Sequence, residues 1–503
     1  MVSVESILGW KPVFRGAFLS HGWTKSKKES GRFEHVSPAN LDWALPPVSY
    51  SLEDVETASV AAQQSLQAWS KLSFEERGKC LDRVRCELDT RRDILARLIA
   101  METGKPLLKA QQEVRWCLET FSFLLGQGES LIRETEWDLG NGVKARVRRR
   151  PRGVLAVIGP FNYPLLIPHG HTVAALWMGN VVLFKPSERA PYAAQVYAEA
   201  FEAAGVPPGV FQMLPGDSRV GARIVRDPSI HGILATCSYD VGIKIQKEIS
   251  ERPHRYSYLA MGGRNSALVG KTAHLDLTAQ SLLKSAFDLN GQSCLCVSKV
   301  FVQRTLVPEL LSRLHDGAKK LSISQPFEED PRPDLGALSS AAIKERFLRY
   351  MNMAENDPLT EEIIMRSKPL EGATKLSRKP LPVGHYVSPS IHLAKGWDSK
   401  SAYQNHEVLG PDLLVIPVDD LSEGLSAIRE SGSGLLTLAF SESSAELQQL
   451  CAEVDTAMMA CNQTHSERFF EAPVHGWKNS GNHRAGGLFT LYTVSQPQAV
   501  ISS

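Results

Sequence analysis

The sequence carries almost no net charge. Its 56 Lys and Arg side chains are balanced by 55 Asp and Glu side chains, which leaves a formal charge of +1. A chain without a strong field of one sign does not attract nucleic acid or an anionic membrane surface over long distances. We therefore expect no nucleic acid among its partners.

Long hydrophobic runs are also missing. A membrane-spanning helix needs about 18 consecutive apolar residues, and no such run occurs in this sequence. Residues 1–16 lack the basic segment followed by a long apolar segment that marks a secretory signal. These absences predict a cytoplasmic protein with no membrane partner.

Cysteine is sparse and is not spaced for metal ligation. None of the eight cysteines belongs to a CxxC pair, which is a common spacing in zinc sites. Cys294 and Cys296 are separated by a single residue, whereas structural zinc prefers two to four. We expect no metal site and no disulfide framework, with most of the thiols buried as small apolar groups.

What the sequence does contain is a pattern of short apolar runs separated by amphipathic stretches. The length of 503 residues, with 43% hydrophobic residues, predicts two or more domains. Runs rich in Val and Ile that alternate with helical patterns are typical of a doubly wound parallel α/β sheet, whose ligands lie beyond the carboxyl ends of the strands. The expected strands are residues 153–159, 179–184, 210–214, 230–235 and 267–269.

A second α/β unit is predicted after this series. Its strands include residues 297–302 and 413–418, and the pattern continues to about residue 460. Residues 52–125 are largely helical by pattern, whereas residues 136–150 alternate charged and apolar residues like an exposed hairpin. Together with a strand pattern at residues 488–493, this hairpin suits sheet addition between subunits.

Cys294 is the strongest candidate for a reactive group. It lies in a polar turn, Asp288-Leu-Asn-Gly-Gln-Ser-Cys294, that follows an apolar stretch. A thiol attacks only as its thiolate, so a working site must lower its pKa or supply a base. The alternative interpretation is a buried inert thiol, which we favour for Cys296.

Two polar segments directly follow predicted strands. Asn162, in the segment Gly159-Pro-Phe-Asn-Tyr-Pro164, has an amide that can donate to an oxygen gaining negative charge, although Asn and Pro also favour ordinary turns. In Lys185-Pro-Ser-Glu188, a carboxylate can bind ribose hydroxyls and a lysine can add a donor. The alternative for this second segment is a polar helix start with proline in the first turn.

These segments resemble the aldehyde dehydrogenase superfamily over nearly the whole chain. Further matching segments occur in the same order, and within the superfamily the phrases at residues 71–77, 153–160 and 480–484 are most similar to succinylglutamate semialdehyde dehydrogenases. The further segments are Glu102-Thr-Gly-Lys-Pro106, Met261-Gly-Gly263, Gly291-Gln-Ser-Cys294, Glu407-Val-Leu-Gly-Pro411 and Ser480-Gly-Asn-His-Arg484.

The resemblance implies a fold, a reaction and a set of site residues. The implied fold has a dinucleotide-binding domain (residues 1–135 and 151–262), a catalytic domain (263–460) and an oligomerisation hairpin and tail (136–150 and 480–503). Cys294 is expected to attack a small-molecule aldehyde, with Asn162 and the Cys294 N–H donating to the developing oxyanion.

The resemblance also implies a cofactor and an assembly. The expected cofactor is NAD rather than NADP, because Glu188 would repel a 2′-phosphate, and the expected assembly is a homodimer or dimer of dimers. The implied cofactor-binding residues are Lys185, Glu188, Ser238, Gly242 and Glu407.

The sequence departs from the family pattern where the chemistry is most sensitive. Ala260 occupies the position of the glutamate that activates water for hydrolysis, Cys237 replaces a glycine near the dinucleotide, and Leu409 replaces a phenylalanine. A positioned base contributes about 100-fold to 10,000-fold, so hydrolysis should be impaired. Transfer of the acyl group to coenzyme A or phosphate, or a non-catalytic scaffold role, are the alternatives.

Three basic residues are candidates for holding substrate carboxylates. They are Arg115, His483 and Arg484, and surface or packing roles remain open for each of them. If the substrate is a semialdehyde such as N-succinylglutamate 5-semialdehyde, groups of this kind should lie near Cys294.

Overall fold

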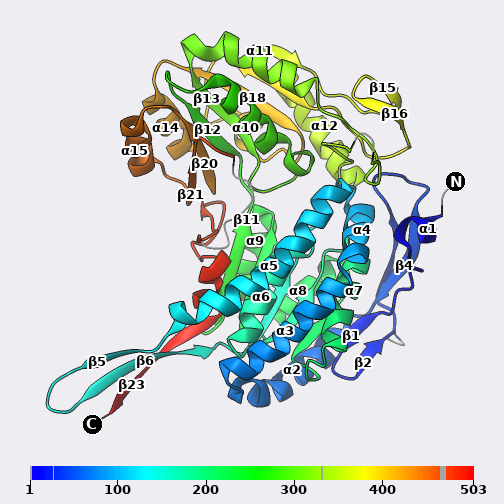
Figure 1. Cartoon of the computed structure of the whole chain (residues 1–503), viewed down its shortest axis with the longest axis vertical. Helices are drawn as coiled ribbons and strands as arrows, with labels where there is room; N and C mark the ends of the chain where they lie inside the picture. The colour runs from blue at the N-terminus through cyan, green and yellow to red at the C-terminus, as the bar shows by residue number, and fades with distance from the viewer. Residues whose placement is uncertain (1–2, 26–27, 330–331, 465–471, 503) are drawn as a thin grey trace.

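The computed structural model describes residues 3–25, 28–329, 332–464 and 472–502. Figure 1 shows two large sheets in the two halves of the molecule and a small third sheet that protrudes from the lower half. No helix among the described residues combines the length and the apolar character needed to cross a bilayer.

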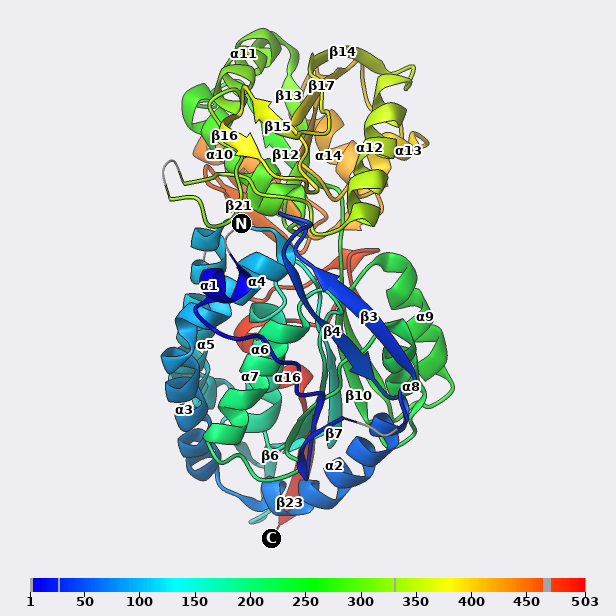
Figure 2. The ribbon, with the colours of Figure 1, turned by 90° about the vertical axis from the view of Figure 1, so that its right-hand side faces the viewer.

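The first large sheet lies in the half that contains the N-terminal helices. Its strands are β1 (Ala17–Leu19), β2 (Gly22–Thr24), β7 (Val154–Ile158), β8 (Val181–Lys185), β9 (Phe211–Met213), β10 (Gly232–Cys237) and β11 (Tyr256–Met261), and its layers include α6 (Leu166–Trp177), α7 (Pro191–Ala203), α8 (Ser218–Arg226) and α9 (Tyr239–Ser250). The strand order is β11-β10-β7-β8-β9-β1-β2, with parallel pairing from β11 to β9 and antiparallel pairing of β1. Helices α6 and α7 cover one face and α8 and α9 the other (Figure 2), which confirms the doubly wound arrangement.

Four long helices precede this sheet in the chain, as the helical pattern of residues 52–125 predicts. They are α2 (Glu53–Lys71), α3 (Phe74–Thr90), α4 (Arg92–Thr103) and α5 (Leu107–Ile132), and they follow the short helix α1 (Val4–Leu8) and the hairpin of β3 (Gly31–Val36) and β4 (Ala44–Tyr50). Ser73 and Glu76 form a capping box at the start of α3, which satisfies main-chain N–H groups that a helix leaves free. Helix α5 packs on α4 and α6 and forms one wall of the site described below.

The second large sheet begins directly after the first. Its strands are β12 (Asn265–Val269), β13 (Val297–Gln303), β14 (Thr360–Met365), β17 (Ser390–Ala394), β18 (Asp412–Val418), β20 (Leu436–Phe440) and β21 (Met458–Cys461), in the order β14-β17-β18-β13-β12-β20-β21. All neighbours pair in parallel except β14, which is antiparallel to β17. Its helices are α10 (Leu275–Phe287), α11 (Val307–Ala318), α12 (Ala341–Glu355), α13 (Ala402–Asn405), α14 (Leu421–Glu430) and α15 (Ser444–Glu453).

Short elements complete the chain. They are the 3-10 turns η1 (Asp288–Gly291), η2 (Arg304–Leu306) and η3 (Gly487–Phe489), the pairs β15 (Gly372–Thr374) with β16 (Ser377–Leu381) and β19 (Ser433–Gly434) with β22 (Trp477–Lys478), and the helix α16 (Thr490–Thr493).

The third sheet is the protruding arm at the lower left of Figure 1. It contains β5 (Thr135–Asp138), β6 (Lys144–Pro151) and β23 (Ser495–Ser502). Strand β23 pairs antiparallel with β6 along its whole length, from Ser495 opposite Pro151 to Ser502 opposite Lys144. The predicted hairpin is therefore present, and the end of the chain adds a third strand to it.

Two strand predictions were wrong in their place or type. Residues 267–269 were expected in the first series, but they belong to β12 in the second sheet, and the first sheet ends instead with β11. A short buried strand has the same apolar pattern in either sheet, and the chain crosses between the sheets within three residues, 262–264.

Residues 488–493 were expected to form a strand, but they form the end of η3 and the helix α16. Leu488 and Leu491 are buried in the first core, where α16 packs against α6. Leu488 and Leu491 are three residues apart, and in so short a segment this spacing fits one turn of helix as well as it fits a strand. The strand that pairs with the hairpin is β23, which follows α16.

Candidate functional site

A cavity of about 230 Å³ lies beside the junction of the two large sheets and is lined by Cys294. Its walls come from α5, α6 and β11, from the turn that contains Cys294, and from residues 474–490. Ala260 and Thr236 also line it, at the carboxyl ends of β11 and β10. The cavity therefore occupies the position where a doubly wound sheet is expected to bind its ligands.

The turn before Cys294 has an unusual backbone conformation. Leu289, Asn290 and Gly291 have φ angles of 47°, 58° and 70°, and a left-handed conformation is unfavourable for leucine. Asn290 holds this turn through its amide, which donates to Ala337 O at 2.7 Å and accepts the Gly336 N–H at 2.8 Å. A Cβ atom on Gly291 would lie 2.0 Å from Gly410 O, so the turn requires glycine there.

Cys294 and Cys296 differ in their surroundings. Burial is the main cause that raises the pKa of the Cys294 thiol to about 12, and the negative charge of Glu407 adds to it. The thiol of Cys296 is buried and donates to Asp288 O at 3.3 Å. Cys294 therefore lines the cavity as a neutral thiol that needs a proton acceptor, whereas Cys296 makes an internal packing contact.

Asn162 lies close to the turn of Cys294. Its Nδ2 donates to Gln292 O at 2.8 Å, and its Oδ1 accepts the Tyr163 N–H at 3.0 Å. An amide NH2 group has two donors, so one N–H is engaged by the main chain two residues before Cys294. The second N–H is the donor that an oxyanion on a substrate carbon would need.

A buried ion pair that the sequence did not indicate fixes the position of Asn162. The Nζ of Lys105 donates to Asn162 O at 2.6 Å and to Glu113 Oε2 at 2.6 Å. The other oxygen of Glu113 accepts the N–H groups of Leu165 and Leu166 at the start of α6. Lys105 falls in one of the matching segments, but nothing in its spacing from Glu113 indicates this contact.

Replacing Lys105 by methionine should destabilise the protein by about 3 kcal/mol or more, because it leaves the buried carboxylate of Glu113 without its cation. The measurement is the free energy of unfolding in urea. The matched control is Lys79→Met, which removes a solvent-exposed pair with Glu75 and should change the free energy of unfolding far less. Equal effects of the two substitutions would contradict the role assigned to Lys105.

Among the described residues, no unpaired carboxylate lines the cavity in place of the missing glutamate. Among the described residues that line it, Asp288 is the only acidic one, and its Oδ1 lies 2.7 Å from Lys109 Nζ. His171 and His475 also line the cavity, and their Nδ1 atoms are buried with no hydrogen-bond partner in the described part of the chain. Burial lowers the pKa of His171 to about 4 and also lowers the pKa of His475. No pattern in the sequence indicated that these two histidines line the cavity.

Four of the predicted cofactor residues lie at or after the ends of two strands of the first sheet, β8 and β10, and the fifth, Glu407, lies between α13 and β18 of the second unit. Lys185 is buried at the end of β8, and its Nζ donates to Pro186 O at 2.8 Å and lies 3.9 Å from Glu188 Oε2. Glu188 lines a second cavity of about 410 Å³ together with Asp217 and Arg219. Burial lowers the pKa of Lys185.

The segment after β10 begins the helix α9. Ser238 occupies the N-cap position of α9, but its side chain makes no capping hydrogen bond. A Cβ atom on Gly242 would lie 2.3 Å from Met261 Sδ and 3.7 Å from Cys237 Sγ. Cys237 thus packs beside Gly242, and burial raises its pKa to about 12.

Glu407 packs against the turn that follows β11. A Cβ atom on Gly262 would lie 2.1 Å from Glu407 Oε1, and Arg346 donates to Glu407 O at 2.6 Å. Burial raises the pKa of Glu407 to about 7, although the charge of Arg346 and a hydrogen bond from the Gly263 N–H act in the opposite direction. The side chain therefore changes its charge near neutral pH.

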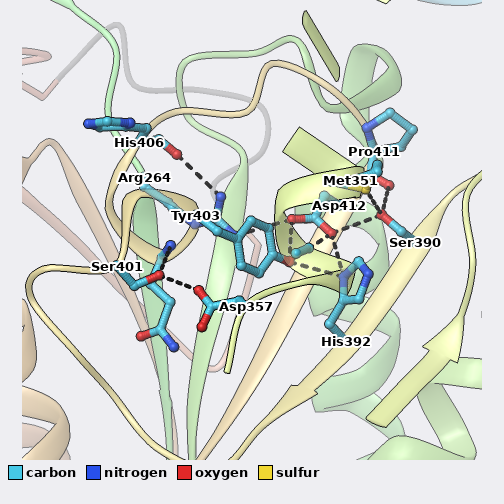
Figure 3. Close-up of polar contacts among 12 residues, drawn as sticks. Arg264, Met351, Asp357, Ser390, His392, Ser401, Tyr403, His406, Pro411 and Asp412 are labelled. Carbon is cyan, nitrogen blue, oxygen red and sulfur yellow. Dashed lines mark hydrogen bonds and ion pairs between the residues drawn. The ribbon is translucent and has the colours of Figure 1, made fainter. Parts of the chain in front are cut away.

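A buried polar network connects this turn to the segment of Glu407 (Figure 3). Arg264 Nη2 lies 3.1 Å from Asp412 Oδ2, and both side chains are fully buried. Asp412 also accepts hydrogen bonds from Ser390 and Tyr403 and contacts His392. Burial raises the pKa of Asp412, but His392 and Arg264 together bring it below its usual value. Because Arg264 also donates to His406 O, the network holds the residue next to Glu407.

The three basic residues predicted to hold substrate carboxylates are not in the cavity. Arg115 is 64% exposed and lies 3.9 Å from Glu119, and Arg484 stacks over the ring of Tyr256. Neither they nor His483 line the cavity that contains Cys294. Arg115 lies about 100° around the axis of α5 from Trp116, the next residue, which lines the cavity.

The chain matches known proteins over almost its full length. The model of the aldehyde dehydrogenase family matches residues 23–500. N-succinylglutamate 5-semialdehyde dehydrogenase of Burkholderia cenocepacia is 29% identical over 456 residues, which cover 90% of each chain. The corresponding protein of Burkholderia multivorans is 28% identical over 487 residues, or 97% of this chain and 96% of the relative. The predicted resemblance to this group is confirmed.

Solved structures agree with the fold. HpcC from Thermus thermophilus has a TM-score of 0.92 at 23% identity, covering 99% of this chain and 95% of that one. A 1-pyrroline-5-carboxylate dehydrogenase from Thermus, solved with bound NAD, has a TM-score of 0.89 at 25% identity, covering 99% and 94%. With the family model matching most of its length, the chain belongs to the aldehyde dehydrogenase family of oxidoreductases.

Proposed function

We propose that this protein oxidises an aldehyde through Cys294, with NAD as the hydride acceptor, and that it hydrolyses the resulting thioester slowly. The observation that carries this proposal is the position of Cys294 in a cavity, on a turn held by Asn290 and contacted by Asn162. A thiol kept only for packing, such as that of Cys296, does not require an amide donor beside it.

The chain's own residues supply the first chemical step. The sulfur of Cys294 bonds to the aldehyde carbon, the carbonyl π-bond breaks with its electron pair passing to the carbonyl oxygen, and the thiol proton passes to solvent water. The developing oxyanion accepts hydrogen bonds from the second N–H of Asn162 and from the Cys294 N–H, and each such donor is worth about 3 to 4 kcal/mol. The Lys105–Glu113 pair keeps Asn162 in place during this step.

The dinucleotide site fits the residues that line it. Thr236 Oγ1 is buried at the cavity with no partner in the described part of the chain, and the Ser238 hydroxyl at the start of α9 is not used for capping. A helix N-terminus with a free hydroxyl suits a pyrophosphate, while Lys185 and Glu188 suit the adenosine ribose and Glu407 the nicotinamide ribose. When bound, the nicotinamide supplies a hydride acceptor. The carboxylate of Glu188 favours NAD over NADP.

The missing base favours a second outcome for the acyl group. Ala260 lines the cavity, and the one lining carboxylate, Asp288, is paired with Lys109 among the described residues. A thioester that water attacks slowly remains available to coenzyme A or phosphate. Acyl transfer is therefore the alternative function, and a non-catalytic scaffold is the alternative if no acyl group forms.

The test is a transient-kinetic experiment with purified protein, NAD and an aldehyde. We expect a rapid burst of about one NADH per site, an acyl adduct on Cys294 by mass spectrometry, and a much slower steady state. Acceleration of the slow phase by coenzyme A or phosphate would support acyl transfer over hydrolysis. No burst and no adduct with any aldehyde would refute the proposed oxidation and favour the scaffold.

Binding of the dinucleotide should weaken as the pH falls through about 7. The pKa of Glu407 is raised to about 7, so the group loses its charge below that pH, and a neutral carboxyl accepts hydrogen bonds from ribose hydroxyls less well. Calorimetry of NADH binding between pH 6 and pH 8 measures the effect. The substitution Glu407→Gln should weaken binding at pH 8 and flatten the dependence, whereas Glu362→Gln, at an exposed position of β14, should leave it unchanged.

We also propose that the protein assembles as a homodimer or a dimer of dimers through the protruding arm. The arm exposes large apolar side chains, including Trp137 at 50% and Ile501 at 68%, and exposed apolar groups on an arm mark a contact surface. Substituting both by glutamate should shift the protein to monomers in light scattering. The control is Val60→Glu, at a position of α2 that is as exposed as Trp137. If the arm variant keeps the mass of the unmodified protein, the interface between subunits lies elsewhere.

A further inference from the structure

The walls of the cavity that contains Cys294 are mostly apolar. The side chains that form them come from two helices of the first half of the chain, from the catalytic turn and from the C-terminal segment. They include Trp116, Phe123, Leu166, Ile167, Leu295 and Val474. A ligand that fills this space meets hydrocarbon and aromatic rings over most of its surface.

The charged groups of the cavity are already engaged by the protein. Lys109 lies 2.7 Å from Asp288, so the two charges offset one another. Lys284 is an exposed residue of α10 and also interacts within the protein. A carboxylate on a substrate would have to compete with these contacts.

The two histidines of the cavity do not supply a positive charge. Burial lowers the pKa of His171 to about 4 and lowers the pKa of His475, so both rings are neutral at physiological pH. Arg115 and Arg484, the two arginines predicted to hold substrate carboxylates, lie outside the cavity and contact Glu119 and Tyr256 instead. A substrate carboxylate that did not displace the contacts of Lys109 or Lys284 would be buried without a cation, which is strongly unfavourable.

We infer that the substrate of this site is an uncharged aldehyde with an apolar aliphatic or aromatic body, and not a semialdehyde that carries carboxylates. This inference rests on the proposed function of Cys294 and separates this chain from the substrate that the names of the Burkholderia relatives indicate. The cavity volume of about 230 Å³ is small for a ligand pocket, which limits the body to a short chain or a single ring.

The test compares two aldehydes that differ only at the far end of the chain. Hexanal ends in a methyl group, whereas 6-oxohexanoate has the same length and ends in a carboxylate. With the full-length protein and NAD, the second-order rate constant of the NADH burst should be at least about 100-fold larger for hexanal. A rate constant for 6-oxohexanoate or N-succinylglutamate 5-semialdehyde that equals or exceeds that of hexanal would overturn the inference.

A second measurement does not depend on turnover. Hexanamide and the monoamide of adipic acid are unreactive analogues of the two aldehydes, and each can be tested for protecting Cys294 from N-ethylmaleimide. Protection by hexanamide alone supports the apolar site, even if no aldehyde is oxidised and the proposed oxidation fails. Equal protection by both amides overturns the inference while leaving the proposed oxidation to the burst experiment.

A charge placed in the wall should reverse the preference. Trp116 is partly exposed on α5, and Trp116→Arg should lower the ratio of the two rate constants by at least about tenfold. Ile167→Arg, on α6, provides the same test if the first variant does not fold. Val383→Arg, at an exposed position outside the cavity, should leave the ratio unchanged, and an unchanged ratio in folded wall variants would count against the inference.

Discussion

Replacing Cys294 by alanine should abolish both the acyl adduct and aldehyde-dependent NADH formation. Covalent chemistry depends on the nucleophile itself, and removing such a group lowers turnover by about 10,000-fold or more. The measurement is the NADH burst together with the mass of the peptide that contains residue 294. The substitution removes one sulfur atom from a partly buried position that lines the cavity, so the fold should persist.

Cys296 provides the matched control. It lies two residues away, and its thiol donates to Asp288 O within the protein. Cys296→Ala should keep the burst and the adduct, with a modest loss of stability from a lost buried contact. If Cys296→Ala removes the adduct and Cys294→Ala does not, the assignment of the nucleophile is wrong.

The pairing of Asn162 with Cys294 in one site was expected from the family resemblance and not from the pattern of apolar runs. Asn162 follows the run that forms the strand β7, whereas the run before Cys294 forms the helix α10, so the rule on the carboxyl ends of parallel strands applies only to Asn162. The structure adds the hydrogen bond from Asn162 to Gln292 O.

The ion pair that supports Asn162 could not be predicted in this way. Lys105 and Glu113 are eight residues apart, across the start of α5, and a lysine and a glutamate with this spacing are more often both exposed on a helix. Their burial follows from the packing of α5 on α6, which depends on the whole first half of the chain. The same limit explains why the sequence left both a substrate role and a surface role open for Arg115, because the side of α5 that faces the cavity is set by tertiary packing.

The strand errors have a related cause. Residues 267–269 and 488–493 were assigned from short apolar patterns, and such patterns do not identify the sheet or distinguish one turn of helix from a strand. The sequence allows polar residues to be named as candidates for the chemistry, but it does not indicate which apolar residues line the cavity. Trp116, Phe123 and Ile167, which line the cavity, look like ordinary helix core residues in the sequence.

Restoring the glutamate by Ala260→Glu should accelerate the steady state by about 100-fold to 10,000-fold, which is the usual contribution of a positioned general base. Ala260 lines the cavity beside Cys294, and the Gly262–Gly263 turn that follows it is retained, so a longer side chain can extend toward a thioester. The burst, which reports attack and hydride transfer, should change little. The measurement is the ratio of the steady-state rate to the burst rate constant.

Ala260→Gln is the matched control for this substitution, because glutamine has nearly the same shape but does not accept a proton at neutral pH. A gain with glutamate and none with glutamine assigns the slow step to the missing base. Adding Cys237→Gly tests whether the thiol that packs beside Gly242 limits the dinucleotide, and it should raise NADH affinity without altering the slow step. A different outcome would assign Ala260 to an acyl-transfer site: Ala260→Glu leaves the steady-state rate unchanged, while coenzyme A or phosphate increases that rate. A cavity that keeps water away from the thioester gains nothing from a general base.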